Sequence, residues 1–496
     1  MWLLIVLALL TRLPYLWGRI IPFSFDHGRD SLAALHLIKT LSLKFIGPWT
    51  SIPGLFFGPG WYYLLAPAYW LSGGDPISGT LLMVALGLVQ IGLAYKYLGV
   101  YEAVIMATAP IWIILSTGAA NPFPMTLVSL IIIILLKQIG EKRKVSVKQM
   151  ALLGLMIGLG FHFSSAFSIF YFLTIPIILG WRKIKLTGKK VVAGFGALVI
   201  AFGPQLLFEI KHGFMQTKAV IGYFSEGETQ KINPGKIKIV TNSIINELGL
   251  AVLPDIKWLK YLGLGLLIIG TTYLIRANLI RAKKKNSFWP EIILLLAVPT
   301  VGFWWLHYNP WYAYGFLPVA VVAVGKILRA LPKKLAMIYL LILLISPIYG
   351  LYNHFDNNRE KLLENKAFLP VKMEVLEYIY SQAGDQSFAS YHYLPEIYDY
   401  AYQYLYLWQG FKGRTLPVEF SYQPGEISYA TEKPDLLDKL PKTQGPAEKI
   451  FLVIERPENK WHYPLDEWLG RIEYREIISK QLIGPEIEVW QVMAGS

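Results

Sequence analysis

The chain has 496 residues, of which 54% are hydrophobic and only 16% charged, whereas soluble globular chains carry roughly 25% charged residues; an ordinary soluble protein is therefore excluded. The net charge of +14 does not indicate a nucleic-acid partner, because the basic residues lie in short segments between apolar runs, where membrane topology explains them. The chain contains no cysteine, which excludes disulfides, thiolate metal sites and cysteine nucleophiles.

Apolar runs of roughly 15 to 20 residues recur between Trp2 and Tyr349, as expected of helices that cross a membrane. The first run contains Arg12 and has no small-residue cleavage site, so we interpret it as a retained helix rather than a signal peptide. The pattern predicts a polytopic α-helical membrane protein with about 11 transmembrane helices. The predicted spans are 2–17, 77–96, 101–117, 122–138, 150–164, 166–181, 190–208, 259–275, 289–305, 312–328 and 335–351.

Four clusters of basic residues set the expected orientation. The positive-inside bias assigns all of them to the cytoplasm, and the predicted spans between successive clusters are even in number, as this assignment requires. The N-terminus is then inside, whereas loops 19–58 and 209–250 and all residues after Leu351 lie outside the plasma membrane. The clusters are Lys137 with Lys142 to Lys144, Arg182 to Lys190, Arg281 to Lys285, and Lys326 to Lys334.

The first outer loop, 19–58, is expected to help form a cavity. Gly47-Pro48, Pro53-Gly54 and Gly58-Pro59-Gly60 break helices, and irregular backbone at membrane depth is stable only where it is buried in protein or lines a wet cavity. The apolar segment from Trp61 to Leu71 is short and rich in Trp and Tyr, which favour the headgroup layer. We interpret this segment as an interfacial or re-entrant helix.

The tail after Leu351 has the mixed pattern of a small α/β domain. Residues 372–383 and 393–407 have helical spacing, whereas Lys449 to Glu455 and Glu486 to Val492 have the pattern of strands. The predicted fold is therefore a transmembrane helical domain, residues 1–351, followed by an extracytoplasmic α/β domain, residues 352–496.

The first outer loop carries a dense charged cluster, Asp26-His27-Gly28-Arg29-Asp30, and charges beside a bilayer are costly and mark functional sites. In a helix that begins at Asp26 and runs to about Lys39, Arg29 and Asp30 lie one turn away on the same face. Asp26 could simply be the N-cap of that helix, with Arg29 as its ion partner. Alternatively, Asp26 is a general base for a hydroxyl nucleophile and Arg29 holds a phosphate. The second interpretation suits group transfer from a lipid-linked phosphate.

Two further candidates are expected at the same outer level. Asn121-Pro122 follows Ser116 and Thr117 in a tight turn, and it is either a turn-forming pair or part of a binding site. His162 falls at the outer end of a predicted span, where a histidine is either a packing residue or a functional one.

The remaining candidate residues lie at two predicted outer membrane boundaries, one charged and one aromatic. Glu209, Lys211 and His212 lie where a predicted helix leaves the membrane, and such a charged exit is either solvated or part of the site. His307-Tyr308 precedes further aromatic residues at another outer boundary, where the alternative is an interfacial aromatic belt.

Several catalytic motifs are missing from the sequence. There is no GxxxxGK[ST] loop and no HExxH motif, which argues against ATP-driven pumping and against a zinc site. There is no GxSxG elbow of a serine hydrolase. Carboxylates near the middle of the predicted spans are scarce, which argues against an ion-coupled transporter.

Several of these segments resemble one family. The stretch from Phe25 to Asp30, Gly47-Pro48 and the stretch from Phe57 to Pro67 are similar to the first outer loop of bacterial membrane glycosyltransferases of the C-type superfamily. The branch is that of protein mannosyltransferases and lipid A aminoarabinose transferases. Further segments that look like this group are Asn121-Pro122, the His162 segment, Pro204 to Phe214 and Ile397 to Tyr402.

The resemblance implies an enzyme that moves a hexosyl or pentosyl group from a membrane lipid, a polyprenyl phosphate, to an acceptor protein, lipid or glycan. It implies inversion at the anomeric carbon and no metal or other cofactor. By the same match, Asp26 is the catalytic residue. Many relatives carry an Asp-Glu pair where this chain has Asp26-His27, so the task of the second acid has no matching residue here, and Asp30 could substitute for it.

We therefore expect Arg29, Lys211 and His212 to bind the phosphate of the donor. The alternative function is a lipid-linked sugar flippase or transporter without transferase chemistry, which predicts charges along a mid-membrane pathway and inverted repeats. The expected substrate-binding residues are Asp30, Tyr62, Tyr63, Asn121, His162, Glu209, His307 and Tyr308.

Overall fold

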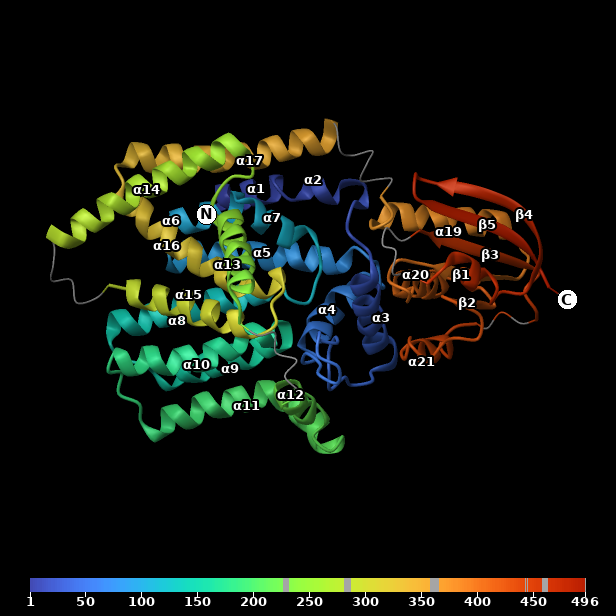
Figure 1. Ribbon diagram of the computed structural model, residues 1–496, viewed down its shortest axis with the longest axis horizontal. Coiled ribbons are helices and arrows are strands. Elements are labelled where there is room, and N and C mark those ends of the chain that lie inside the picture. Colours follow the sequence, from blue (N-terminus) through green and yellow to red (C-terminus); the bar gives the residue numbers. More distant parts are fainter. Residues whose placement is uncertain are drawn as a thin grey trace.

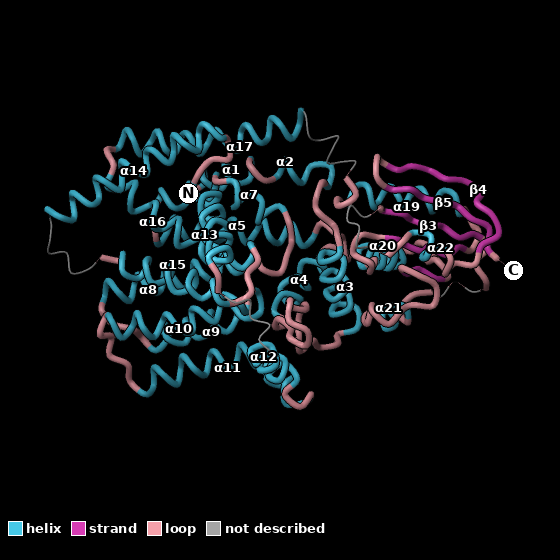
Figure 2. The backbone as a smooth tube through the Cα atoms, in the orientation of Figure 1, coloured by secondary structure: helices cyan, strands magenta, loops and turns pink. Residues whose placement is uncertain are grey.

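Helices make up most of the protein, and a single sheet lies near the C-terminus. The computed structural model describes residues 1–225, 232–280, 287–356, 365–441, 443, 445–456 and 463–495. Figure 1 shows a broad layer of roughly parallel and antiparallel helices, with the sheet and its own helices at one end of the molecule. Figure 2 shows that the strands are confined to this end.

The predicted spans coincide with helices or with broken helices. Six helical segments are long and apolar enough to cross a membrane, or seven if the bent pair α6 and α7 forms one span, among the described residues. The count of about 11 spans stays a prediction, since several of the other helices are shorter. The helices are α1 (Trp2–Leu10) with α2 (Leu13–Leu16) and η1 (Trp17–Arg19), α5 (Ser78–Tyr97), α6 (Val100–Thr108) with α7 (Pro110–Thr117), α8 (Met125–Lys142), α9 (Val147–Phe163), α10 (Ser165–Trp181), α11 (Gly188–Lys211), α14 (Lys257–Ile280), α15 (Trp289–Trp305), η2 (Pro310–Phe316) with α16 (Leu317–Ala330), and α17 (Lys333–Asp356).

Arg12, the charge inside the first apolar run, stabilises the break between α6 and α7. The two helices meet at an angle of 60°, because Pro110 has no N–H and clashes with the preceding turn. Backbone carbonyls freed in this way need donors inside a membrane. The buried guanidinium of Arg12 donates to the carbonyls of Ala107 at 3.0 Å, Met106 at 3.1 Å and Trp112 at 3.2 Å.

The charged cluster forms the first turn of α3 (Phe25–Thr40). The N-cap is Ser24, whose N–H donates to Nδ1 of His27 at 3.4 Å, so the interpretation of Asp26 as the N-cap is wrong. Asp26 is free for another role because Ser24 and His27 already occupy the cap. Helix α4 (Gly60–Leu71) has 12 residues and is about 18 Å long, which is too short to span a bilayer core of about 30 Å, as expected for an interfacial or re-entrant helix.

Segment 209–250, expected as a loop, is largely helical. It contains α12 (Met215–Ser225) and most of α13 (Pro234–Val252). The side chain of Asn233 caps α13 by accepting from the Lys236 N–H at 2.8 Å. Helix α13 packs against α15, α16 and η2, so this segment belongs to the helical core rather than to a free loop.

The C-terminal part is an α/β unit with a mixed five-stranded sheet of order β2-β1-β3-β5-β4. Strand β1 is parallel to β2 and β3, whereas β5 is antiparallel to β3 and β4. The predicted helix 393–407 begins only at Tyr400, because Tyr393 is the last residue of the buried strand β1 and residues 394–399 form an irregular connection. The elements are α19 (Leu369–Ala383), β1 (Phe388–Tyr393), α20 (Tyr400–Phe411), β2 (Glu419–Ser421), α21 (Lys433–Leu437), β3 (Lys449–Glu455), α22 (Leu465–Leu469), β4 (Tyr474–Ile483) and β5 (Ile487–Ala494).

Helix α20 of this unit packs directly on α3. The closest approach is at Gly28, where any Cβ would collide with the backbone of Tyr400 and Ala401. The chain on either side is also joined: the Phe23 N–H donates to the Ala367 carbonyl at 2.8 Å, and the Leu369 N–H donates to the Ile21 carbonyl at 2.9 Å. The C-terminal unit therefore holds the helix that carries the charged cluster.

Candidate active site

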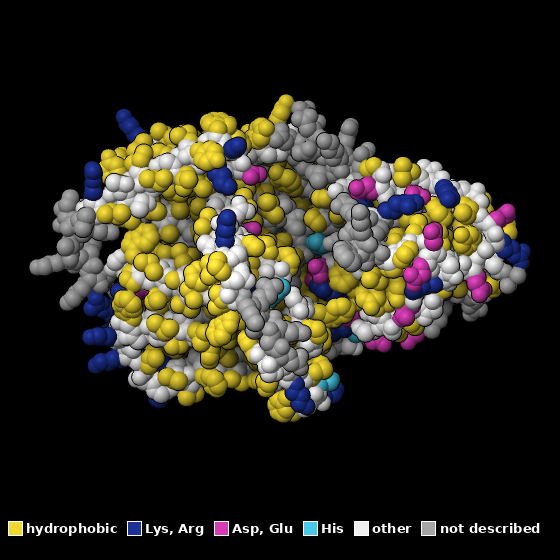
Figure 3. Space-filling view, viewed as in Figure 1, with side chains coloured by type: hydrophobic (Ala, Val, Ile, Leu, Met, Phe, Trp, Pro, Cys, Tyr) yellow, Lys and Arg dark blue, Asp and Glu magenta, His cyan; other side chains and the backbone are white. Residues whose placement is uncertain are grey.

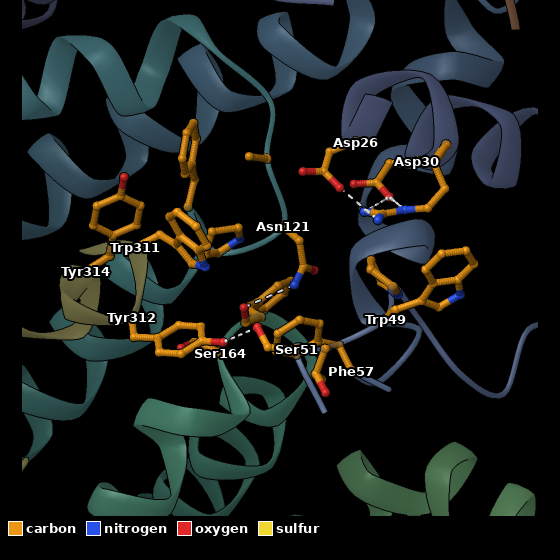
Figure 4. Close-up of a pocket in the computed structure, with 17 residues that line it drawn as sticks. Asp26, Asp30, Trp49, Ser51, Phe57, Asn121, Ser164, Trp311, Tyr312 and Tyr314 are labelled. Carbon is orange, nitrogen blue, oxygen red and sulfur yellow. Dashed lines mark hydrogen bonds and ion pairs between the residues drawn. The ribbon is translucent and has the colours of Figure 1, made fainter. Parts of the chain in front are cut away.

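A cavity of about 430 Å³ lies where the first turn of α3 faces the segments that precede α8 and α16. Figure 4 shows the carboxylates of Asp26 and Asp30 on one side and the aromatic residues Trp311, Tyr312 and Tyr314 on the other. The cavity is lined by Asp26, Arg29, Asp30, Pro48, Trp49, Thr50, Ser51, Phe57, Ala120, Asn121, Pro122, Phe123, Phe163, Ser164, Trp311, Tyr312 and Tyr314.

The two acids of α3 share Arg29 but differ in exposure. Nη1 of Arg29 lies 2.7 Å from Oδ1 of Asp26, and Nη2 lies 2.8 Å from Oδ1 of Asp30. The indole N–H of Trp61 donates to the other oxygen of Asp30 at 2.7 Å. The Asp26 side chain is 63% exposed and that of Asp30 only 2%. Asp26 is therefore the acid that a ligand in the cavity can reach, and Asp30 fixes Arg29 from behind.

Burial sets the protonation of this cluster. It raises the pKa of Asp30 to about 6, although Arg29 acts in the opposite direction. Burial alone lowers the pKa of Arg29, but the charges of Asp30 and its neighbours raise it overall, so the guanidinium stays protonated. Burial also lowers the pKa of His27 to about 4. A neutral His27 can accept the Ser24 N–H and hold the start of the helix in place.

Loop 41–59 and η2 form the wall that faces the acids, as expected for a loop that helps to form a cavity. The hydroxyls of Ser51 and Tyr312 are 3.2 Å apart and join the two segments. Trp49 and Trp311 line the cavity and are about half exposed, and Phe57 also belongs to the lining (Figure 4). Sequence reasoning missed Trp49, Ser51 and Phe57.

Asn121 lines the cavity, as predicted for a binding residue. Its amide nitrogen donates to the Phe163 carbonyl at 3.1 Å. Its buried Oδ1 and the buried Oγ of Ser164 have no hydrogen-bond partner within the described ranges. Buried polar atoms are normally satisfied, so these two atoms are available to a ligand.

His162 supports the wall of the cavity rather than lining it. Nδ1 accepts the Gly60 N–H at 3.0 Å, and Nε2–H donates to the Ala201 carbonyl at 2.8 Å, so both ring nitrogens are used. A Cβ at Gly58 would overlap the imidazole. The Gly58-Pro59-Gly60 motif thus lets the backbone approach His162, which fixes the first turn of α4.

Three more predicted substrate-binding residues, Tyr62, Tyr63 and Glu209, do not line the cavity. Tyr62 is buried beside Arg29 and Asp30. The Tyr63 hydroxyl bonds to the backbone N–H and carbonyl of Lys44, each at 3.0 Å. Glu209 caps α12, because its carboxylate accepts the N–H groups of Gln216 and Thr217 at 2.8 and 2.9 Å.

Lys211 and His212 are exposed at the end of α11 and do not line the cavity. His212 is held there by stacking on Phe208, with ring centroids 4.0 Å apart, and by its Nδ1 bond to the Phe208 carbonyl at 2.9 Å. Of the three predicted phosphate-binding residues, the structure thus brings only Arg29 into the cavity.

His307 and Tyr308 lie next to the aromatic wall without lining the cavity. The rings of His307 and Tyr312 are 6.4 Å apart, and the Tyr308 hydroxyl donates to Ser243 at 3.2 Å. Trp311, Tyr312 and Tyr314, the aromatic residues that follow them and share the same two interpretations, line the cavity. No group of three or more His, Asp or Glu side chains in the described part of the chain is placed to hold a metal ion.

The arrangement offers three kinds of contact to a ligand. Asp26 presents an accessible carboxylate, Arg29 presents a fixed guanidinium beside it, and Trp49 and Trp311 present apolar ring faces. A carboxylate in this position can take a proton from a hydroxyl or an amine. A guanidinium can bind a phosphate through paired hydrogen bonds.

No family model matches the sequence, and no curated protein matches it either. Two solved structures share the fold. ArnT from Cupriavidus metallidurans bound to undecaprenyl phosphate superimposes with a TM-score of 0.61 at 12% identity, over 99% of this chain and 97% of that chain. The apo form of the same protein gives a TM-score of 0.59 at 11% identity, with the same coverage. The chain therefore has the fold of ArnT, an aminoarabinose transferase of the C-type superfamily, which is the fold that its sequence resemblance implied.

Proposed function

We propose that this protein is a membrane glycosyltransferase that moves a sugar from a polyprenyl-phosphate donor to an acceptor hydroxyl or amine on the extracytoplasmic side. The observation that carries the proposal is the exposed carboxylate of Asp26, held at the edge of the cavity by a buried Arg29–Asp30 pair. The shared fold supports it, because ArnT binds undecaprenyl phosphate in one of the two structures.

In the proposed reaction, Asp26 acts as the general base. The acceptor oxygen or nitrogen attacks the anomeric carbon, its proton passes to the Asp26 carboxylate, and the bond between that carbon and the phosphate oxygen breaks. The products are the glycosylated acceptor and the polyprenyl phosphate, with inversion at the anomeric carbon. A well-placed general base contributes about 10²- to 10⁴-fold in rate.

Arg29 is the proposed ligand of the leaving phosphate. Its Nη1 now donates to Asp26 at 2.7 Å, so a phosphate oxygen at this nitrogen competes with Asp26. Binding of the donor would thereby release Asp26 to face the acceptor. Asp30 and Trp61 keep the guanidinium in place while this exchange occurs. A fixed charge of this kind lowers the barrier by on the order of 3 kcal/mol.

The aromatic wall is proposed to hold the sugar. Trp311 and Tyr314 line the cavity opposite the carboxylates, and Trp49 lines it on the same side as Asp30. Aromatic ring faces combine apolar contact with directional packing. The unpartnered Oδ1 of Asn121 and Oγ of Ser164 are acceptors or donors for sugar hydroxyls.

The test is the Asp26→Asn variant, assayed in detergent with several polyprenyl-phosphate sugars and unlabelled acceptors. Because the Asp26 side chain is exposed, the variant is expected to fold like the wild type and to lose at least about 10²-fold in kcat. Asp385→Asn, in an exposed turn of the C-terminal unit, is the matched control and should keep full activity. A variant at Asp26 with unchanged transfer would refute the proposed mechanism.

A lipid flippase or transporter remains the rival function, and one observation speaks against it. In α8, the residues between the cavity and the far end of the helix, Leu130 to Ile133, include three that are essentially fully buried in the apolar core. A polar route through the bundle would have to displace them. If Asp26→Asn still translocates lipid-linked sugar in vesicles while the wild type shows no transfer, the rival function is correct.

A further inference from the structure

A second cavity, of about 410 Å³, lies at the opposite end of the helices that border the candidate active site. Asn121 and Tyr314 of the first cavity come just before α8 and α16, whereas the second cavity is lined from the last turns of both helices. Figure 3 shows basic side chains gathered along this end of the helical layer, away from the sheet. The proposed function makes no use of this cavity.

Four basic side chains line the second cavity: Lys137, Arg182, Lys326 and Arg329. Two of them are fixed by buried acids. Arg329 donates to both oxygens of Glu102 at 2.7 and 2.6 Å, and Arg182 forms an ion pair with the buried Glu291. These two arginines are therefore neutralised and rigid, and they shape the walls of the cavity.

The two lysines form no ion pair within the described part of the chain. Lys137 donates to the Tyr97 carbonyl at 2.9 Å. Lys326 lies 5.7 Å from the ring of Trp289, and no hydrogen bond or ion pair to it occurs in the described ranges. Among the described residues, the two acids in the lining are Glu102, which is paired with Arg329, and the exposed Glu141. A partly buried ammonium without a counter-ion is costly, and a bound anion would offset that cost.

The cavity opens at the level expected for lipid headgroups. Leu274 belongs to its lining, and Tyr273 beside it is 47% exposed. Trp181, next to the lining residue Arg182, is 63% exposed. Exposed Trp and Tyr at helix ends are typical of the membrane interface, and basic pockets between membrane helices bind anionic headgroups.

We propose that this second cavity binds the phosphate headgroup of an anionic membrane lipid, with Lys137 and Lys326 as its charge partners. The headgroup phosphate lies between the two ammonium groups, and the acyl chains leave along the apolar surfaces of α10 and α14. The ligand is a lipid rather than free phosphate, because the exposed aromatic residues place the cavity at the interface.

The experiment uses the purified full chain in neutral detergent with short-chain phosphatidylglycerol, phosphatidylcholine or inorganic phosphate as the probe. Thermal unfolding and native mass spectrometry report binding, so neither readout depends on glycosyl transfer. Phosphatidylglycerol is expected to raise the unfolding midpoint of the wild type, and phosphatidylcholine is not. Each lysine near an anionic lipid contributes a factor of about five in affinity, so the double variant Lys137→Gln, Lys326→Gln should bind phosphatidylglycerol about 30-fold more weakly.

Two controls keep the result interpretable. Lys144→Gln with Lys185→Gln removes the same charge from exposed loops outside the cavity and should bind like the wild type. Lys137→Arg with Lys326→Arg keeps the charge and should retain most of the binding. The proposal is overturned if the glutamine variant binds phosphatidylglycerol as tightly as the loop control does. It is also overturned if inorganic phosphate protects as well as the lipid.

Discussion

Asp26 and Asp30 lie one helical turn apart and have different roles because their surroundings differ. Asp26 faces the cavity, whereas Asp30 is enclosed by Arg29 and Trp61. Pairs of carboxylates whose environments separate their proton affinities are typical of acid–base sites. The same guanidinium contacts both acids, so the protonation state of Asp30 controls how strongly Arg29 holds Asp26.

This coupling predicts an acidic limb in the activity profile. Asp30, with a pKa of about 6 in the folded protein, is ionised above that pH and shares Arg29 with Asp26. As the pH falls through about 6, Asp30 takes up a proton and Arg29 pairs with Asp26 alone, so that Asp26, the proposed general base, becomes less available. We expect kcat/KM to fall in this range.

The variant Asp30→Asn tests the assignment. It should be less active than the wild type near neutral pH, because the charge behind Arg29 is missing, and it should lack the step near pH 6. The measurement is kcat/KM from about pH 5 to pH 8 for both proteins. A step that persists in Asp30→Asn would mean that another group controls it.

A third carboxylate shows that suggestive geometry alone does not make a site. Oγ of Ser390 lies 3.0 Å from Nε2 of His392, whose Nδ1 contacts Asp399, in the order of contacts found in serine hydrolases. All three side chains are fully buried, so no substrate reaches Ser390. The network instead fastens β1 to the start of α20.

For single residues, the sequence predicted which charged side chains lie at the cavity better than it predicted which residues contact one another. Asp26, Arg29 and Asp30 stood out because charged residues are rare beside a membrane, and the structure places all three at the cavity. His162 was an equally plausible residue type, but both of its nitrogens are used by backbone groups. Ser51 and Tyr312 meet through a contact between segments some 260 positions apart, and no local pattern encodes such a contact.

Among the elements, the crossing of α3 and α20 has the tightest constraint. At Gly28 the backbones of the two helices touch, so the position tolerates no side chain. The exposed turn of α3 that carries Asp26 is two residues away, and any shift of this crossing moves the carboxylate.

The substitution Gly28→Ala therefore should destabilise the protein and reduce transfer. Overpacking at a buried contact costs about 1–3 kcal/mol, and the expected result is a lower unfolding midpoint together with a lower kcat. Gly196→Ala is the matched control, since a Cβ there meets nothing within 4 Å. Equal midpoints for the two variants would show that the crossing adjusts without strain.

Local pattern predicted the long apolar helices well and the connecting segments poorly. Helix α13 was not predicted, because the charged residues at 209–212 favoured a loop. Asn233-Pro234 followed by apolar residues at helical spacing is nevertheless the pattern of a helix start. Strand β1 was not predicted because its six residues are all buried, and a strand buried on both faces shows no alternation.

For the whole molecule, the apolar pattern predicted the long helices but not how the C-terminal unit packs on α3. The predicted runs coincide with helices because hydrophobic length is a direct requirement of a bilayer. The position of the C-terminal unit on α3 depends on contacts such as Lys44 with Glu432, at 2.8 Å across 388 positions. Such contacts have no periodic signature.

The orientation of the chain is testable because the sequence contains no cysteine. Two exposed residues can each be replaced by a single cysteine. They are Lys144, in the basic loop between α8 and α9, and Asp385, in the C-terminal unit. We expect a membrane-impermeant maleimide to label Asp385→Cys in intact cells and Lys144→Cys only after permeabilisation. The reverse labelling would invert the topology and place the candidate active site in the cytoplasm.

The pairing of α3 with α20 also has a consequence for biosynthesis. Leu32 and Leu35 of α3 are fully buried in the finished protein, but α20 leaves the ribosome only after some 370 more residues. Long-range contacts form late in folding. The apolar face of the helix that carries Asp26 therefore stays incompletely covered through almost all of translation, and a chain that terminates early cannot complete the cavity.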